Sequence, residues 1–374
     1  MKVVIVNCND PYENRVELLY EYFTTRNHNV SVIASDFRHF HKVRRTDKKK
    51  DYIFIKSKPY YKNISVARLS SHYLFARNAF KLLETMEVDL IYVLLPPNSL
   101  AVFASKYKLS HPKVKLCFDI IDLWPEAMVA GKVKSLFPFK IWKNMRNKNL
   151  GVADYVITEC DLFHKVLGDI LQGVQTSTIH MARKDEGIKI NPQINLDEIH
   201  LCYLGSINHI IDILTINKLI KGLSNKKPVV LHIIGDGENR DSFIESAKES
   251  GARVEYCGKI YEPDEKQSIF DKCHFGLNMM RKTVCVGLTM KSIDYFQAGL
   301  PILNNIQGDT TQLVEDYRIG LNVTEENIEA IVDIVINSKI DELLKMRFDT
   351  RKVFETMLTD EVFYEKMEEV MARI

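Results

Sequence analysis

The chain has 374 residues, of which 46% are hydrophobic and 27% are charged, so it can bury a large core and is neither disordered nor fibrous. Its formal net charge of +2 argues against a protein dedicated to binding duplex nucleic acid. The length exceeds what one small core needs and predicts two domains of ordinary size.

Residues 1–181 alternate short β-branched runs with longer amphipathic segments. The chain begins M-K-V-V-I-V-N, whose apolar run fits a first strand and is too short for a signal peptide. The expected strands are 3–6, 30–33, 90–94, 114–118 and 155–158, and the expected helices are 13–25, 67–84 and 162–171. This alternation predicts a Rossmann-like domain, with a mostly parallel sheet covered by helices.

A polar segment, residues 182–198, contains Gly187 and Pro192 and is interpreted as an inter-domain connection. The pattern then restarts, with expected strands at 200–204, 229–234, 254–256 and 274–278. We expect a second Rossmann-like domain over 199–350, facing the first across a cleft, and C-terminal helices whose last part, 351–374, packs back on the first domain. Ligands would bind at the carboxyl ends of the strands.

Two segments are strongly basic: His39–Lys50, H-F-H-K-V-R-R-T-D-K-K-K, and Phe137–Lys148, F-P-F-K-I-W-K-N-M-R-N-K. One interpretation is a solvated loop followed later by an ordinary surface helix. The other is contact with an anionic membrane surface, which attracts cations and holds aromatic rings at the headgroups. No apolar stretch approaches the roughly 20 residues of a membrane-spanning helix, so such contact would be peripheral.

Neither cysteines nor histidines suggest a metal. The seven cysteines form no Cys-x-x-Cys pair, which predicts reduced thiols in a cytoplasmic protein. The eleven histidines show no ligand spacing, and no Asp-x-Asp stands at a strand end. We therefore expect no metal and no cofactor.

Three glycine turns follow expected strands of the second domain: Gly205-Ser206, Gly235-Asp236-Gly237 and Gly258. Glycine lets the backbone turn sharply and approach a ligand closely. Strand-to-helix turns also use glycine for geometry alone, so each turn by itself is weak evidence. Their repetition at successive strand ends favours a binding face.

The stretch V-G-L-T-M-K-S-I-D-Y-F-Q-A-G-L-P predicts a helix over 288–298. Lys291 and Asp294 would share one side of it, one turn apart. The helix start near Gly287 would favour a diphosphate, Lys291 would add a cation, and Asp294 could accept both hydroxyls of a ribose. The alternative is an ordinary surface ion pair between Lys291 and Asp294.

The same residues resemble a known family. G-L-T-M-K-S-I-D-Y, the ending Ala298-Gly299-Leu300-Pro301 and the turn I-I-G-D-G resemble the C-terminal domain of retaining GT-B-fold glycosyltransferases. Together with D-L-W-P-E at 122–126, they look like a bacterial branch that builds capsule, lipopolysaccharide or exopolysaccharide. The resemblance implies a nucleotide-sugar donor, UDP-sugar favoured, and a saccharide acceptor, lipid-linked or an oligosaccharide.

Aligned on this family, Asp294 takes the position of the ribose ligand. The sequence departs from the pattern at Val286, where an acidic residue is usual, and at Ser206 and Ile211, where an Arg and a Lys clamp the phosphates. Other cations would then have to bind the phosphates. The expected donor-binding residues are Gly205, Ser206, Gly235, Asp236, Gly237, Arg281, Lys282, Gly287, Leu288, Thr289, Lys291 and Asp294.

Acceptor chemistry is expected in the first domain. Asp122 and Glu126 would orient the acceptor or stabilise the oxocarbenium-like centre, although Asp122 could simply cap the segment that Pro125 starts. Acceptor-binding candidates are Trp124 and three helix arginines, which could instead be plain solvated charges: Arg15, Arg68 and Arg77.

Two other functions are compatible with this organisation. A sugar-nucleotide epimerase would need ionisable groups around the sugar, where Val286 stands. A non-catalytic partner subunit would explain the missing clamp residues. Our leading hypothesis is a cytoplasmic, peripherally membrane-associated, retaining and metal-independent glycosyltransferase of surface-polysaccharide biosynthesis.

Overall fold

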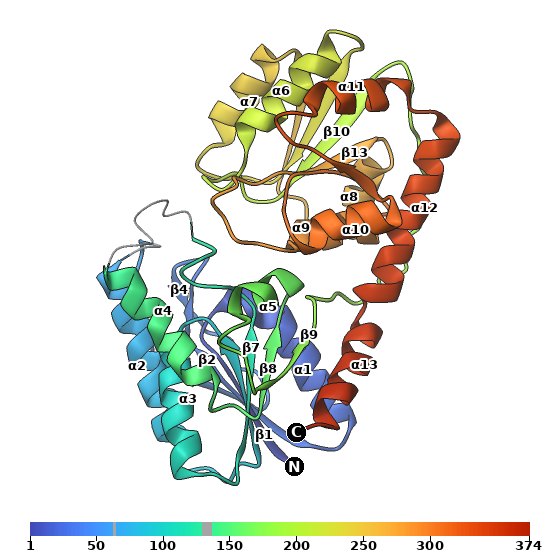
Figure 1. The fold of residues 1–374 in the computed structure, drawn as a ribbon. Coiled ribbons are helices and arrows are strands. Elements are labelled where there is room, and N and C mark those ends of the chain that lie inside the picture. Colours follow the sequence, from blue (N-terminus) through green and yellow to red (C-terminus); the bar gives the residue numbers. More distant parts are fainter. Residues whose placement is uncertain (63–64, 129–136) are drawn as a thin grey trace. The chain divides into compact units, whose positions relative to one another are not determined.

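The computed structural model describes residues 1–62, 65–128 and 137–374, which form two compact α/β units (Figure 1). Unit 1 comprises Met1–Met181 and Phe363–Ile374, and unit 2 comprises Ala182–Val362. Each unit is built on a parallel sheet covered by helices, so the predicted fold class is confirmed. Among the described residues, no helix is both long and apolar enough to cross a membrane.

Unit 1 contains a seven-stranded sheet in the order β5-β2-β1-β6-β7-β8-β9, with every described strand pair parallel. Its strands are β1 (Lys2–Asn7), β2 (Asn29–Ser35), β5 (Tyr52–Ile55), β6 (Leu90–Leu95), β7 (Lys115–Ile120), β8 (Tyr155–Thr158) and β9 (Gln175–Thr178). The central strand β6, L-I-Y-V-L-L, is buried along its whole length, which is why it reads as one continuous apolar run. A two-stranded ribbon of β3 (Phe37–Arg38) and β4 (Val43–Arg44) accompanies the sheet.

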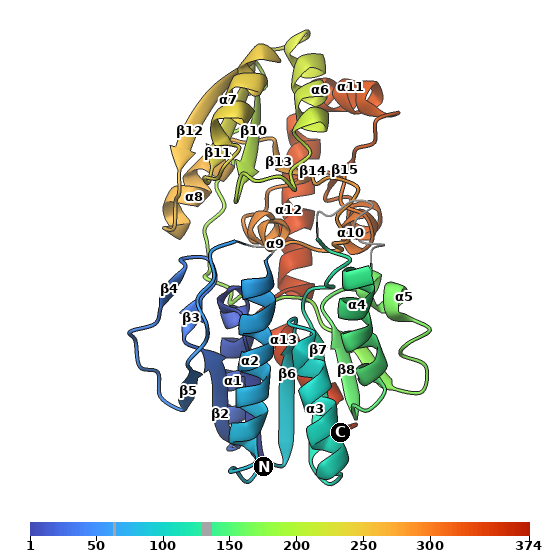
Figure 2. The ribbon, with the colours of Figure 1, turned by 90° about the vertical axis from the view of Figure 1, so that its left-hand side faces the viewer.

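Helices cover both faces of this sheet. They are η1 (Asp10–Tyr12), α1 (Glu13–Thr25), α2 (Val66–Leu83), α3 (Ser99–Ser110), α4 (Phe137–Leu150), α5 (Asp161–Leu167) and α13 (Asp360–Met371). Figure 2 shows α2, α3 and α4 side by side in front of the sheet, with α1 and α13 behind it. Within unit 1, the Arg15 guanidinium of α1 lies 4.6 Å from the centroid of the Phe363 ring of α13.

Unit 2 contains a six-stranded parallel sheet in the order β12-β11-β10-β13-β14-β15. The strands are β10 (Ile199–Leu204), β11 (Val229–Ile234), β12 (Ala252–Gly258), β13 (Phe275–Asn278), β14 (Ile302–Asn304) and β15 (Gly320–Asn322). The helices are α6 (Ile213–Ser224), α7 (Arg240–Glu249), α8 (Pro263–Phe270), α9 (Met290–Gln297), α10 (Asp309–Tyr317), α11 (Ile328–Asn337) and α12 (Ile340–Met357).

Strand order reverses direction once in each sheet, between β1 and β6 in unit 1 and between β10 and β13 in unit 2. Crevices at such switch points, beyond the carboxyl ends of the strands, are where open α/β sheets bind ligands. In unit 1, Asn7 ends β1 and residues 121–126 follow β7. In unit 2, Gly205 follows β10 and residues 279–289 connect β13 to α9. Most of the expected functional residues therefore lie at the carboxyl edges of their own sheets, where open α/β sheets bind ligands.

Candidate functional site

The glycine turns of unit 2 hold neighbouring strand ends in direct backbone contact. Gly205 and Gly235 both have positive φ, +119° and +142°. A Cβ on Gly235 would lie 1.9 Å from the carbonyl oxygen of Gly205, and one on Gly237 would lie 2.3 Å from the carbonyl oxygen of Ile207. Glycine is thus required here for backbone packing, whether or not a ligand also approaches.

Helix α9 begins at Met290, two residues later than predicted. The Thr289 hydroxyl caps it by accepting a hydrogen bond from the backbone N–H of Ser292 at 3.2 Å. The Gly287 carbonyl instead accepts hydrogen bonds from the backbone N–H and the hydroxyl of Thr310, at 2.9 and 2.6 Å. Gly287 and the buried Leu288 therefore belong to the approach to the helix.

Lys291 lies in the first turn of α9 and is 9% exposed. Its ammonium nitrogen lies 5.0 Å from the centroid of the Tyr203 ring, at the end of β10. Within residues 1–62, 65–128 and 137–374, this ammonium has no carboxylate partner and makes no hydrogen bond. Burial lowers the pKa of Lys291 to about 7.

Asp294 pairs with an arginine that the sequence analysis did not select. Its Oδ1 atom lies 3.1 Å from Nε of Arg183, close enough for an ion pair, although the N–H is not aligned for a hydrogen bond. Burial raises the pKa of Asp294, while the charges of Arg183 and Lys266 act in the opposite direction. The alternative surface pair between Lys291 and Asp294 is therefore not formed.

Three asparagines, of which Asn278 and Asn304 are buried, connect the carboxyl ends of β13, β14 and β15. The Asn278 amide donates to Oδ1 of Asn304, and the Asn304 amide donates to Oδ1 of Asn322, each at 2.9 Å. The Thr289 hydroxyl donates to Oδ1 of Asn278 at 3.2 Å, which ties the helix cap to this ladder. The ladder fixes the start of α9, and with it Lys291, relative to the sheet.

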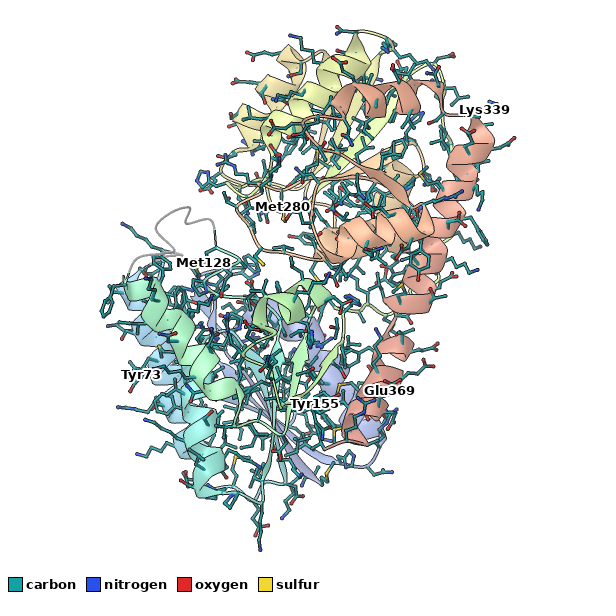
Figure 3. All side chains as sticks on the ribbon, viewed as in Figure 1. Tyr73, Met128, Tyr155, Met280, Lys339 and Glu369 are labelled. Atoms are coloured by element: carbon teal, nitrogen blue, oxygen red, sulfur yellow. The ribbon has the colours of Figure 1, made fainter. Side chains whose placement is uncertain are left out.

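The remaining donor-site candidates lie on the loops of the same edge. Ser206 is exposed, and Asp236 accepts a hydrogen bond from the N–H of Gly237 at 2.8 Å. Arg281 and Lys282 are exposed on the loop that follows Met280, labelled in Figure 3. Unit 2 thus brings buried and exposed cations to the edge where its glycine turns lie.

In unit 1, Asp122 accepts hydrogen bonds from two aromatic side chains. The Trp124 indole N–H donates at 2.6 Å, and the Tyr12 hydroxyl donates at 3.4 Å. Burial raises the pKa of Asp122 to about 6, although these hydrogen bonds and the charge of Arg68 favour the carboxylate. A carboxyl group that titrates near neutrality can orient or deprotonate a hydroxyl.

Glu126 is held in place by two basic side chains of α4. It accepts hydrogen bonds from the guanidinium of the fully buried Arg146 at 2.9 and 3.1 Å, and Lys143 lies 3.1 Å away. Arg146 also donates to the Trp124 carbonyl at 2.7 Å. Burial opposes ionisation of Glu126, but hydrogen bonding and charge from Arg146 hold its pKa below the ordinary value. Glu126 thus anchors the turn that presents Asp122.

The three arginine candidates occupy different environments. Arg15 is fully buried, with a two-point ion pair to Asp119 at 2.8 and 3.2 Å, so it is not available to an acceptor. Arg77 is exposed on α2. Arg68 is buried at the Asp122 edge, and its guanidinium carbon lies 4.4 Å from the centroid of the Trp124 ring.

Lys42, which the sequence analysis did not select, lies with Arg68 beside the ring of Tyr60. The Lys42 ammonium and the Arg68 guanidinium carbon lie 5.1 and 5.7 Å from the centroid of the Tyr60 ring. The pKa values of both cations are lowered, first by burial, and that of Lys42 also by Arg68. Lys42 and Arg68 therefore share the Tyr60 ring, and Arg68 also lies over Trp124, the donor to Asp122. Cations beside aromatic rings suit an anionic saccharide.

Comparisons with known proteins agree with this architecture. Residues 198–338 match the family model described as glycosyl transferases group 1, and no curated protein matches the chain. Sucrose-phosphate synthase from Thermosynechococcus elongatus superposes with a TM-score of 0.72 at 14% identity, covering 100% of this chain and 98% of that one.

Two further solved structures are similar in fold over the whole chain. The lipopolysaccharide outer core galactosyltransferase WaaB gives a TM-score of 0.69 at 14% identity, and HepE of Anabaena, with UDP and glucose, gives 0.66 at 12%; each covers 100% of both chains. The chain therefore has a GT-B-type fold, and its residues 198–338 carry the glycosyl transferases group 1 signature in unit 2.

Proposed function

We propose that this protein is a glycosyltransferase that moves a sugar from a nucleotide diphosphate sugar to a saccharide acceptor. The observation that carries the proposal is Lys291, a buried cation without an anionic partner among the described residues, in the first turn of α9. A bound diphosphate would supply the missing charge, and the N–H groups of the helix start would add to it. HepE was solved with UDP and with UDP-glucose, which supports testing UDP-sugars first.

In the transfer step, the bond between the anomeric carbon and the diphosphate breaks, and negative charge develops on the leaving oxygens. Lys291 and the first turn of α9 stabilise that charge, with the exposed Arg281 as a further candidate, so no metal is required. The acceptor hydroxyl bonds to the anomeric carbon on the face that the diphosphate leaves. Its proton passes to the departing diphosphate oxygen, and the product keeps the anomeric configuration of the donor.

Asp294 binds the ribose hydroxyls in this proposal, and Arg183 holds its carboxylate in place. Asp122 orients the acceptor hydroxyl, and Arg68 with Lys42 attracts an anionic group of the acceptor, as in a lipid diphosphate sugar. A lipid-linked acceptor would place the enzyme on the inner face of the cell membrane, in assembly of a surface polysaccharide. The basic, aromatic surroundings of Asp122 support an acceptor of this class.

A second candidate is a non-catalytic partner subunit, favoured by one observation. Ile211 stands where the resemblance implies a phosphate-clamping lysine, and it is buried in the core of unit 2. The test is incubation with labelled UDP-glucose and UDP-galactose and a lipid diphosphate sugar, with and without a chelator. Transfer that survives chelation and gives the retained anomer supports the enzyme. Stabilisation by UDP without any transfer or hydrolysis would favour the partner subunit.

A further inference from the structure

Helices α2, α3 and α4 form one layer that contains no acidic residue. Their 44 residues (18, 12 and 14) include nine basic ones: Arg68, Arg77, Lys81, Lys106, Lys108, Lys140, Lys143, Arg146 and Lys148. On the other side of the same sheet, α1 and residues 363–371 of α13 carry six acidic residues and two basic ones. Unit 1 is therefore electrically polarised across its sheet.

Most of the basic residues on this layer are available at the surface. Five are exposed and have no ion pair among the described residues: Arg77, Lys81, Lys106, Lys140 and Lys148. On α2, the exposed residues Leu69, Tyr73, Arg77 and Lys81 recur every four positions and so share one side of the helix. Figure 3 shows Tyr73 directed away from the sheet.

Apolar side chains are exposed on the same layer. Val66 at the start of α2 is 83% exposed, and Phe137 at the start of α4 is 74% exposed. Next to them, a groove of about 370 Å³ runs between the two helices and is lined almost entirely by apolar atoms, from residues that include Leu69, Ile141 and Trp142. Exposed apolar residues beside unpaired cations favour a lipid surface over a soluble polyanion.

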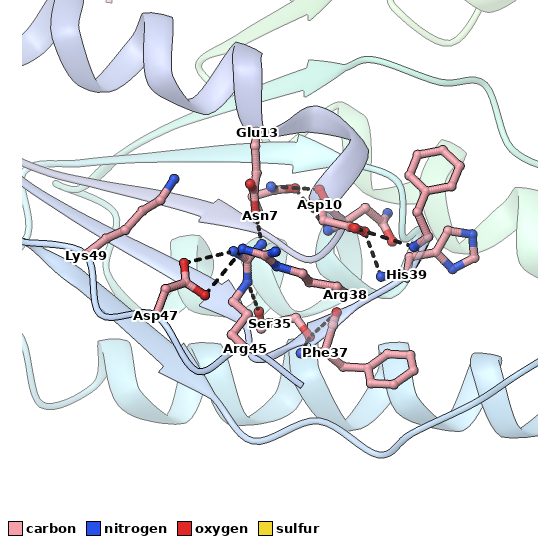
Figure 4. Close-up of polar contacts among 12 residues, drawn as sticks. Asn7, Asp10, Glu13, Ser35, Phe37, Arg38, His39, Arg45, Asp47 and Lys49 are labelled. Atoms are coloured by element: carbon pink, nitrogen blue, oxygen red, sulfur yellow. Dashed lines mark hydrogen bonds and ion pairs between the residues drawn. The ribbon is translucent and has the colours of Figure 1, made fainter. Parts of the chain in front are cut away.

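The other basic segment of the sequence, His39–Lys50, differs from this layer because most of its charges are paired. Its arginines are neutralised by nearby carboxylates, and Figure 4 shows Arg38 and Arg45 beside Asp47 and Glu13. The pairs are Arg38 with Asp47, Arg44 with Asp36, Arg45 with Glu13 and Asp47, and Lys49 with Glu17. Only Lys48 and Lys50 are exposed lysines of this loop without an ion pair among the described residues, so it provides a control surface.

We propose that the α2–α3–α4 layer of unit 1 is the face that docks on an anionic lipid bilayer. The cations of α2, α3 and α4 contact the headgroups, and Val66, Phe137 and Ile141 enter the boundary with the acyl chains. This docking face would hold the enzyme at the membrane that the proposed function expects, and its biological purpose rests on that function. It has a test of its own, because docking requires neither donor nor acceptor.

The test is co-sedimentation of the full chain with vesicles of phosphatidylcholine alone or rich in phosphatidylglycerol, without nucleotide. One basic side chain near an anionic surface strengthens binding about fivefold, so Lys140→Glu/Lys148→Glu should weaken binding to the anionic vesicles by at least about 25-fold. The loop variant Lys48→Glu/Lys50→Glu changes the net charge equally and should bind like wild type. Val66→Ser/Phe137→Ser should lose binding while keeping its charge.

Three results would overturn the inference. The first is that the wild type binds anionic and neutral vesicles equally. The second is that the helix and loop variants lose vesicle binding equally. The third is that Val66→Ser/Phe137→Ser binds vesicles as fully as the wild type. The last result, with equally tight binding to heparin, would identify the layer as a site for soluble polyanions. Donor binding by the same variants, measured with UDP, separates a failure of docking from a failure of the proposed transfer.

Discussion

The ammonium of Lys291 lies 5.0 Å from the centroid of the Tyr203 ring, and no carboxylate among the described residues neutralises it. A cation over an aromatic ring is stabilised by about 0.5–2 kcal/mol, which is less than its burial costs. The arrangement therefore leaves the free protein with an amine whose protonated form a bound anion would stabilise.

The pKa of Lys291 predicts how stability depends on pH. Its folded-state pKa of about 7 lies below the unfolded value of 10.5, so between these limits the unfolded state binds more protons. The contribution of Lys291 to the free energy of unfolding should therefore rise from about pH 7 towards pH 10. Urea denaturation should show this rise in the wild type relative to Lys291→Met. Parallel pH profiles of the two proteins would contradict it.

Asp294 and Lys291 should be distinguishable by the part of the nucleotide they bind. Asp294→Ala removes a ribose partner and should weaken UDP and uridine alike, by about tenfold, the worth of a charged hydrogen bond. Lys291→Met should weaken UDP but leave uridine unaffected. Calorimetric titration of both ligands into both variants makes the comparison, and the two roles would be refuted if the losses were interchanged.

Asp122 should matter for transfer more than for stability. Its pKa of about 6 lies above the unfolded value of 3.8, so its contribution to stability falls as pH rises from about 4 to 6. Asp122→Asn should keep or raise the free energy of unfolding at neutral pH, because the amide oxygen can still accept from Trp124. Transfer should drop by about 10²-fold if the carboxylate orients the acceptor hydroxyl. An Asp122→Asn variant with full activity would remove Asp122 from the mechanism.

Glu126 should show the opposite behaviour. Glu126→Ala leaves Arg146 buried without its partner, so we expect a loss of about 3–5 kcal/mol in the free energy of unfolding. Urea denaturation measures this loss, with Lys143→Ala, which removes only the half-buried partner of Glu126, as the matched control. Equal and small losses in both variants would mean that Arg146 does not depend on Glu126.

Gly235 should tolerate no side chain. Gly235→Ala would place a Cβ 1.9 Å from the Gly205 carbonyl oxygen, so the strand ends would have to separate. Gly258, with φ of +69° and open space around its Cβ position, is the control, and Gly258→Ala should cost only about 1–2 kcal/mol. We expect a much larger loss of thermal stability at Gly235 than at Gly258. Similar losses would indicate that only the backbone angle matters.

The fold was predictable because the central strands are long apolar runs separated by amphipathic helices. Strands such as β9, Q-T-S-T, and β15, G-L-N, escaped prediction, since only their pairing within the sheet makes them strands. The Asn278–Asn304–Asn322 ladder was hidden for a similar reason. Asparagine is typical of turns, and its use between buried strand ends depends on tertiary contacts.

Lys291, Asp294 and Asp122 of the candidate site were singled out from the sequence, and their roles stay predictions. Arg183 escaped because it lies in a polar segment whose place is fixed by distant backbone: its N–H donates to the Leu358 carbonyl at 2.9 Å. Lys42 was not predicted because its basic loop resembles a solvated one in the sequence. Only the folded β3–β4 ribbon places Lys42 beside Tyr60. Arg15 was expected to contact an acceptor or to be a plain solvated charge, yet it is fully buried and its charge is compensated by Asp119.

The most direct test of the account is calorimetric titration of UDP into the wild type and Lys291→Met at about pH 8, in two buffers of different ionisation enthalpy. At this pH, Lys291 is largely neutral in the free protein. A bound diphosphate should raise the pKa of Lys291, so binding should be accompanied by uptake of a proton. We expect net proton uptake in the wild type, none in Lys291→Met, and at least tenfold weaker binding by the variant. Equal affinity and equal proton exchange in the two proteins would contradict the assignment of α9 as the diphosphate-binding element.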